Sequence, residues 1–145
     1  MTFATGYLDD IQLVGSGELS GVNNTVLSAT AFEDGLKIGR FAKLDAGSID
    51  NLDGSATPVI AGVVLRNVAS AIEDGAVITA ANNRQIDYLR SGLCTVDVKA
   101  GQTPVMFGAV TADNATGEAL ATGGEATNFE FIKQVKAGVW LIRGI

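Results

Sequence analysis

Two clusters of acidic side chains in the sequence have the residue types that bind metal ions. Asp45, Asp50 and Asp53 lie close together, and a second group follows at 113–118 (DNATGE). Carboxylate oxygens suit calcium, but neither group has the alternating ligands and closing glutamate of an EF-hand loop. Asp and Asn also shape turns through hydrogen bonds to their own backbone. We interpret both groups as solvated turns, with a weak calcium site as the alternative, and expect no metal and no cofactor.

A glycine-rich run at 13–21 (LVGSGELSG) has some of the spacing of a dinucleotide-binding loop. Such a loop passes from a strand into a helix whose N-terminus faces a pyrophosphate. Here the run continues into Val22-Asn23-Asn24-Thr25 and another strand-like segment. We therefore interpret it as part of a flexible arm.

Histidine is absent from the chain, and cysteine occurs once, as Cys94. Without imidazole, Ser-His-Asp and Cys-His nucleophile pairs and all His-ligated zinc or iron sites are excluded. A lone cysteine cannot form an internal disulfide, which fits a reducing cytoplasm. The alternation in 93–99 places Cys94 on one face with Val96 and Val98, so we expect a buried core thiol. The sequence favours a protein that is not an enzyme.

Lys37, Phe41 and Lys43 share one face of a predicted strand, where an aromatic ring between two cations could stack on a base. The chain, however, has 10 Lys and Arg against 16 Asp and Glu, for a net charge of −6. Phosphate-backbone binding needs clustered cations. We expect no nucleic-acid partner and interpret this face as solvated or partner-facing. Trp140 is interpreted as a core residue, with an interface anchor as the alternative.

The negative charge is concentrated near the N-terminus. Residues 1–36 contain no Lys or Arg and carry five of the six net negative charges, on Asp9, Asp10, Glu18, Glu33 and Asp34. Residues 37–145 are nearly neutral, with 10 cationic and 11 acidic side chains. An acidic N-terminal segment suits a basic partner surface.

Short β-branched or aromatic runs separated by Gly, Asp and Asn predict an all-β protein, with almost no helical periodicity. Ala137-Gly138 fits the turn of a closing hairpin. Strands are expected near 25–32, 36–44, 58–66, 76–79, 85–90, 93–99, 105–110, 129–136 and 139–143.

Nine short strands predict a jelly-roll-like sandwich or a small β-barrel. Glycines interrupt residues 1–24 every few positions, and their apolar residues follow no sustained period. We expect an extended Gly-rich N-terminal arm at 1–24 and a single β domain at 25–145. The longest apolar run, 58–65, has 8 residues, whereas a membrane span needs about 20. We expect no membrane association and no secretory signal.

Several segments together resemble a known family. The Gly-rich arm is followed by 36–44 (LKIGRFAKL), 58–66 (PVIAGVVLR) and 90–96 (RSGLCTV), then by Gly117 and the closing Gly138-Val139-Trp140. This order resembles the structural cement, or decoration, proteins of tailed-bacteriophage capsids, over most of residues 15–145. The resemblance implies a jelly-roll or β-barrel subunit, made in the host bacterial cytoplasm and located in the virion on the capsid exterior.

The resemblance also implies partners and a mechanism. The major capsid protein is the expected partner, and the subunit, a homo-oligomer (dimer or trimer), would bridge neighbouring capsid proteins to stabilise the mature shell. The arm is the expected interface segment, with its apolar anchors and charged residues at Phe3, Tyr7, Leu8, Asp9, Asp10, Leu13 and Val14. Whether the arm adds a strand to a neighbouring sheet is left open.

Two other classes of function predict different structures. An oligomeric β-barrel enzyme with an intersubunit site would have a pocket with convergent polar groups and a strongly perturbed carboxylate. A carbohydrate- or cell-surface-binding module would have an exposed aromatic platform. Burial of Trp140, Tyr7 and Tyr88 would oppose the second class.

Overall fold

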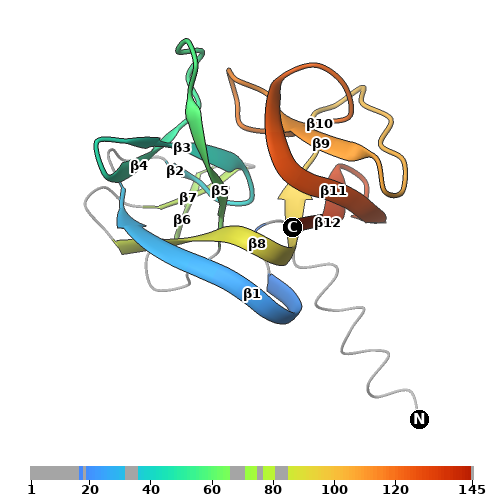
Figure 1. Cartoon of the computed structure of the whole chain (residues 1–145), viewed down its shortest axis with the longest axis horizontal. Coiled ribbons are helices and arrows are strands. Elements are labelled where there is room, and N and C mark those ends of the chain that lie inside the picture. Colours follow the sequence, from blue (N-terminus) through green and yellow to red (C-terminus); the bar gives the residue numbers. More distant parts are fainter. Residues whose placement is uncertain are drawn as a thin grey trace.

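The computed structural model describes residues 17, 19–31, 36–65, 71–74, 77–80 and 85–144 (Figure 1). Every element in this part of the chain is a β-strand, which confirms the all-β prediction. The strands are β1 (Leu19–Thr30), β2 (Leu36–Lys37), β3 (Phe41–Asp45), β4 (Ser48–Asn51), β5 (Val59–Val64), β6 (Ala71–Asp74), β7 (Val77–Ala80), β8 (Gln85–Asp97), β9 (Ala109–Ala112), β10 (Ala119–Leu120), β11 (Glu125–Lys136) and β12 (Val139–Gly144).

One antiparallel sheet contains nine of these strands, in the order β10-β9-β11-β12-β8-β5-β3-β4, with β1 also paired to β8. The path is open, but two isolated bridges curl its ends back toward the centre. Ala31, just after β1, bridges Ile49 of β4, and Val98, just after β8, bridges Ala119 of β10. The sheet therefore forms two lobes, β1-β5-β3-β4 and β12-β11-β9-β10, on either side of β8 (Figure 1).

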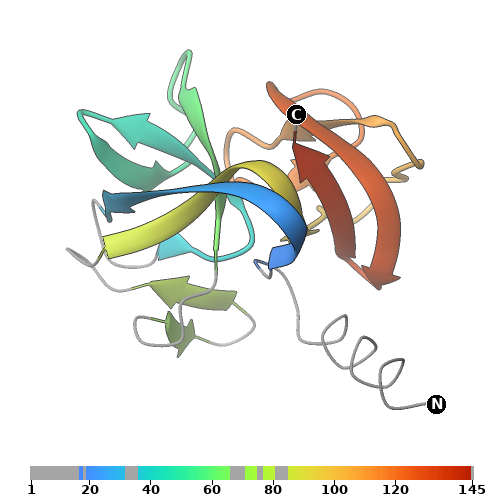
Figure 2. The same cartoon turned by 60° about the horizontal axis from the view of Figure 1, so that its bottom comes forward.

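The longest strand, β8, connects the two lobes. Its first half pairs with β5 and with most of β1, and its second half pairs with β12, from Gly92 to Asp97. Figure 2 shows β1 lying along β8. A second sheet, β2-β7-β6, is separate from this path. No helix among the described residues is long and apolar enough to cross a membrane.

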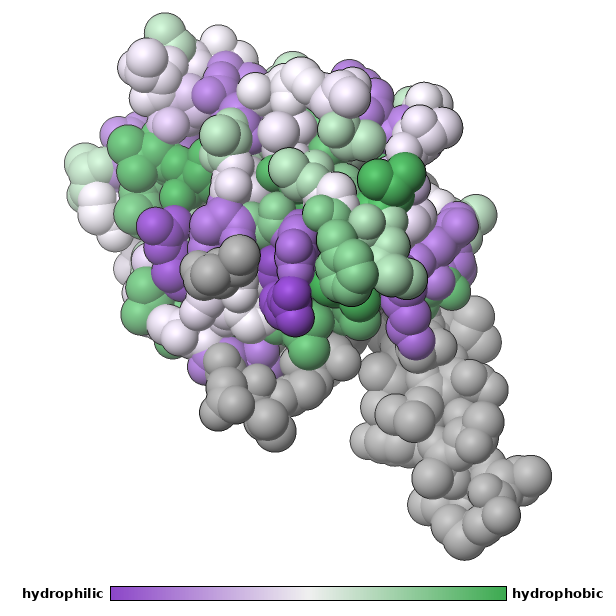
Figure 3. Space-filling model, turned by 45° about the vertical axis from the view of Figure 1, so that its right-hand side comes forward, coloured by the Kyte–Doolittle hydropathy of each residue, from purple (hydrophilic) through white to green (hydrophobic). Residues whose placement is uncertain are grey.

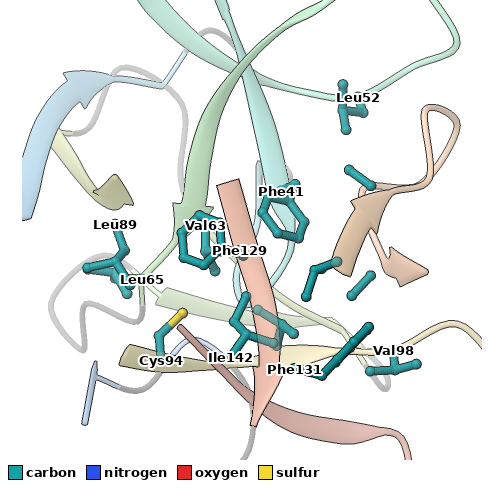
Figure 4. Packing of buried hydrophobic residues seen from close by; sticks show 14 residues of the cluster. Phe41, Leu52, Val63, Leu65, Leu89, Cys94, Val98, Phe129, Phe131 and Ile142 are labelled. Atoms are coloured by element: carbon teal, nitrogen blue, oxygen red, sulfur yellow. The ribbon is translucent and has the colours of Figure 1, made fainter. Parts of the chain in front are cut away.

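The larger hydrophobic core fills the second lobe and the junction between the lobes. Phe41 of β3 and Phe129 of β11 meet edge to face, with ring centroids 5.5 Å apart, and Val63 and Ile142 lie beside them (Figure 4). Each such fully buried side chain stabilises the fold by about 1.5–3 kcal/mol. The first lobe has its own core, from residues of β1 to β5 and β8: Ala29, Ala31, Leu36, Ile38, Ala42, Ile49, Ala61, Val64, Ile86 and Tyr88.

Several predicted strand boundaries differ from the structure. The first strand begins at Leu19 rather than at 25, and the segments 85–90 and 93–99 form the single strand β8. A turn at 38–40 divides the predicted strand 36–44 into β2 and β3, and 105–108 is a loop before β9. The closing hairpin of β11 and β12 is confirmed, with Lys136 paired to Val139. The division into an arm at 1–24 and one β domain stays a prediction.

Candidate interaction surfaces

The seven predicted interface residues, from Phe3 to Val14, lie outside the described residues. The chain enters the described part at Gly17, whose N–H donates a hydrogen bond to the Thr95 carbonyl oxygen (2.7 Å). Gly17 is buried with a φ of +79°, and a Cβ there would lie 2.7 Å from Ile38 Cγ2. The base of the N-terminal segment is thus fixed against β8, at the junction between the lobes.

A loop between β8 and β9 exposes three consecutive large apolar side chains. Val105, Met106 and Phe107 are 65%, 61% and 63% exposed. Single exposed apolar residues are ordinary, but a contiguous group marks an interaction site. The segment was predicted as part of a strand, so the sequence interpretation missed it. The available signal was three large apolar residues between Pro104 and Gly108, two residue types that favour turns.

Backbone hydrogen bonds hold this loop on β11. The Phe107 N–H donates to the Phe131 carbonyl oxygen (2.7 Å), and the Phe131 N–H donates to that of Gly108 (2.9 Å). The Gly108 N–H donates to the Val105 carbonyl oxygen (3.0 Å). Phe107 has a φ of +63°, in the left-handed region that bulky residues rarely adopt. Such strain persists where the surroundings determine the conformation, so the loop presents its apolar side chains in one fixed arrangement.

A hollow of about 370 Å³ lies next to this loop. It is lined by 98–104, Gln134, Gly138 and Trp140. The half-buried Trp140 packs edge to face on Phe131, with ring centroids 5.4 Å apart. The Trp140 ring therefore packs on the edge of the hydrophobic core and also lines the hollow. The interpretation of Trp140 as a core residue is supported by this packing, and the interface-anchor alternative stays a prediction.

Of the residues that line the hollow, Lys99 alone carries a formal charge. Lys99 lines it and forms an ion pair with Asp113, with Nζ 2.5 Å from Oδ2. Lys133 of β11 is exposed, but it pairs with Leu141, so it lies on the opposite face of the β11–β12 hairpin from Gln134 and Trp140. We call Lys99, Pro104–Phe107 and Trp140 the 99–107 surface. In Figure 3 the second lobe is turned forward, and hydrophobic and hydrophilic patches alternate on this face.

A lysine side chain pairs with one carboxylate in each acidic cluster. Lys43 Nζ donates to Asp53 Oδ1 (3.0 Å) and to Ser55 Oγ (3.2 Å), and Lys99 occupies the corresponding place at Asp113. Among the described residues, no group of three or more His, Cys, Asp or Glu side chains is arranged to hold a metal ion. The Lys43 and Lys99 ammonium groups neutralise the Asp53 and Asp113 carboxylates.

These pairs shift the pKa values of their members. Hydrogen bonds from Ser55 and then Lys43 lower the pKa of Asp53 to about 2, and Lys99 followed by the Ala115 N–H lowers the pKa of Asp113. The carboxylates in turn raise the pKa values of Lys43 and Lys99. Neither Asp53 nor Asp113 lines the hollow beside Trp140 or the more polar hollow of about 420 Å³ at Arg90. The arrangement predicted for an intersubunit enzyme site is not found there.

The strand face suggested for base stacking is not available. Phe41 is only 1% exposed and belongs to the core, and Lys43 is 8% exposed. Because a turn separates β2 from β3, Lys37 does not lie on one continuous strand with them. Tyr88 is buried, and Tyr7 lies outside the described part. Among the described aromatic residues, Phe107 is the exposed one, and it lies on an apolar loop rather than on a flat platform.

Cys94 lies in the second half of β8 and is fully buried. Burial raises the pKa of its thiol well above the ordinary value, because the thiolate would be desolvated. The prediction of a core thiol is therefore confirmed.

Comparisons with known proteins identify relatives of this fold. A solved structure titled "The capsid of Myoviridae Phage XM1" contains a similar chain, with a TM-score of 0.77 and 32% sequence identity. The alignment covers 90% of this chain and 89% of the other. A search of curated protein sequences gives no match.

The family model described as "XM1 gp53 minor capsid protein" matches residues 5–143. This match spans nearly all of the 145 residues, and the structural neighbour comes from a phage capsid. The expected likeness to a capsid protein of tailed bacteriophages is thereby confirmed. The chain belongs to the XM1 gp53 minor capsid protein family and is a structural component of the phage virion.

Proposed function

We propose that this protein is a cement or decoration subunit, which binds the outer surface of the phage head and bridges neighbouring major capsid proteins. The observation that carries the proposal is the apolar loop Val105–Phe107. A small capsid protein that presents three large apolar side chains on a backbone-anchored loop has a surface suited to burial in a larger assembly.

The role is mechanical rather than catalytic. A subunit bound across several capsid proteins adds interface free energy, which must be lost before the shell can open. A loop already held in its binding conformation loses little conformational entropy on docking, so more of the contact energy remains for stabilisation. We propose a homo-oligomer, dimer or trimer, as the bound form.

The N-terminal segment is the second part of the proposed interface. Phe3, Tyr7, Leu8, Leu13 and Val14 supply apolar anchors, and two neighbouring aspartates supply negative charge. Because Gly17 is fixed against β8, the contacts made by this segment would be transmitted directly to the body of the subunit.

Co-sedimentation with expanded capsids tests the proposal. The purified protein is expected to co-sediment with expanded capsids and to raise the temperature at which they release their DNA. Met106→Ser is expected to lower occupancy, whereas Val59→Ser, at a similarly exposed apolar site (64%), serves as the matched control. Absence of binding by the unaltered protein would overturn the capsid role. Unchanged occupancy after deletion of residues 2–14 would remove the N-terminal segment from the mechanism.

A further inference from the structure

We infer that copies of this chain meet through the 99–107 surface, with Phe107 of one copy inserted into the hollow beside Trp140 of another. The inference rests on the homo-oligomer in the proposed function, and it names the surface through which that oligomer forms. The apolar loop is then buried between subunits of the bound form.

Phe107 is costly to the free subunit in two ways. Its side chain is 63% exposed, and its φ of +63° is one that bulky residues rarely adopt. Backbone hydrogen bonds from Phe107 to Phe131, and from Phe131 to Gly108, hold the loop in this conformation. Strained conformations of this kind cluster at functional sites. We therefore take the projecting ring as the group that binds.

The hollow beside the loop has the size and the chemistry to receive that ring. It has a volume of about 370 Å³ and is lined by Trp140, Gln134, Gly138 and residues 98–104. Its one formal charge, on Lys99, is already paired with Asp113 of the same chain. A phenyl ring that enters can meet the indole edge to face or offset, the arrangements that aromatic pairs prefer.

The protrusion and the hollow are neighbours on one face, since Pro104 of the hollow directly precedes Val105 of the loop. A face that carries both is complementary to itself, as contact between identical subunits requires. Charge agrees, because Val105, Met106 and Phe107 are uncharged and Lys99 is neutralised within its own chain. Two such faces meet without like-charge repulsion. A second copy therefore satisfies the loop and the hollow at once.

The size of the contact predicts a weak association in solution. Stable interfaces bury about 800 Å² on each partner, and even a large aromatic side chain buries only about 150–250 Å². The three side chains of the loop supply part of the required area, so the rim of each hollow must contribute as well. We expect an equilibrium between monomer and oligomer that shifts with protein concentration.

Sedimentation velocity of the free protein over a concentration series tests the inference. The unaltered protein is expected to associate as its concentration rises. Phe107→Ser is expected to weaken that association roughly tenfold or more. Val59→Ser, which removes a similarly exposed apolar side chain (64%) from the first lobe, should leave it unchanged. The hydrogen bonds of the loop come from the backbone, and circular dichroism checks that Phe107→Ser folds.

Trp140 reports which surface is used. It is the only tryptophan of the chain, so association through the hollow is expected to lower acrylamide quenching of its fluorescence and to shift its emission to the blue. Both changes should follow the same concentration dependence as sedimentation. Phe107→Ser should show neither change over that range.

Mixing two variants tests the pairing of loop and hollow. Gln134 lines the hollow, so Gln134→Glu adds a carboxylate to it. A fluorescently labelled Phe107→Lys chain should bind Gln134→Glu roughly threefold more tightly than it binds the unaltered protein, since a cation on the loop then meets a carboxylate in the hollow of the other copy.

Three results would overturn the inference. The first is a protein that stays monomeric across the concentration series. The second is association that Phe107→Ser does not weaken, or that leaves Trp140 quenching unchanged, which would assign the oligomer to another surface. The third is equal binding of labelled Phe107→Lys to both partners.

None of these measurements uses a capsid, so this inference and the cement role can fail separately. Capsid binding by a protein that stays monomeric would overturn the inference and leave the cement role intact. An oligomer that forms through Phe107 but does not bind capsids would do the reverse.

Discussion

Asn114 of the second lobe hydrogen-bonds to Ser55 of the first, with Nδ2 2.9 Å from the carbonyl oxygen. The Gly54 N–H returns a bond of 2.7 Å to the Asn114 carbonyl oxygen. Together with β8, these contacts connect the loop 52–58 to the loop 113–118. These two loops therefore connect the lobes. The residues that meet there, Ser55 and Asn114, are 59 positions apart in the sequence.

Substitution of Asn114 by Ala should loosen this junction. The change removes the Nδ2 bond to Ser55 but leaves the backbone bond from Gly54 in place. Because Asn114 Oδ1 is buried without a hydrogen-bond partner among the described residues, its removal offsets part of the loss. We expect a decrease of about 1 kcal/mol in the unfolding free energy, measured by urea denaturation. Thr122→Ala, at an exposed turn, is the control, and an equal effect there would contradict the prediction.

Acid should weaken the same junction. In the unfolded chain Asp53 and Asp113 titrate near 3.8, whereas in the fold Asp53 titrates at about 2 and Asp113 below its usual value. The unfolded state therefore binds more protons as the pH falls, and the stabilisation from both pairs is complete above about pH 4 and lost toward pH 2. The unfolding free energy of the unaltered protein should fall across this range. In the double variant Asp53→Asn/Asp113→Asn, the unfolding free energy should depend less steeply on pH. An unchanged slope would show that these two carboxylates do not cause the pH dependence.

The parts of the fold that depend on neighbouring residues in the sequence could be predicted. Alternation identified most strands, and Ala137-Gly138 located the final hairpin. The continuity of β8 could not be predicted, because Gly92 in its middle reads as a turn. Because Gly92 has no side chain, Asn24 of β1 can pack directly against it. The Leu93 N–H donates a hydrogen bond to Asn24 Oδ1 (2.9 Å). Asn24 and Leu93 are 69 positions apart in the sequence, so a local sequence pattern cannot predict their contact.

The candidate surface was missed for a related reason. Val105, Met106 and Phe107 have the composition of a strand, and a strand would bury half of them. The bond from the Phe107 N–H to Phe131 turns the backbone at a positive φ and leaves all three side chains exposed. The two acidic groups were interpreted as solvated turns, but Asp45 and Asp50 lie in β3 and β4, and Asp50 and Asp113 are buried. The lysines that pair with Asp53 and Asp113 are 10 and 14 residues away in the sequence.

Gly117 and Gly123 form a matched pair for testing the lobe contact. Both have a φ of +76°, but a Cβ at Gly117 would lie 2.4 Å from the Phe41 carbonyl oxygen, whereas Gly123 has nothing within 4 Å. Gly123→Ala meets only the backbone penalty of about 1 kcal/mol. Gly117→Ala adds a clash with backbone and should cost roughly 2–4 kcal/mol. Thermal unfolding of both variants checks this, and equal melting temperatures would show that the lobes do not meet as described.

Cys94 should report on the opening of the whole sheet. Its strand is paired on both sides at this residue, with Leu19 of β1 and Ile142 of β12, and its side chain is fully buried. A thiol reagent can reach it only when these strands separate, so native labelling should be about a thousandfold or more slower than in denaturant. Mass spectrometry of labelling over a urea series gives the rate. Met106→Cys adds an exposed thiol to the same molecule as an internal control, which should react at the rate of an unfolded cysteine. Rapid native labelling of Cys94, at a rate independent of urea, would mean that β8 opens locally and cannot connect the lobes rigidly.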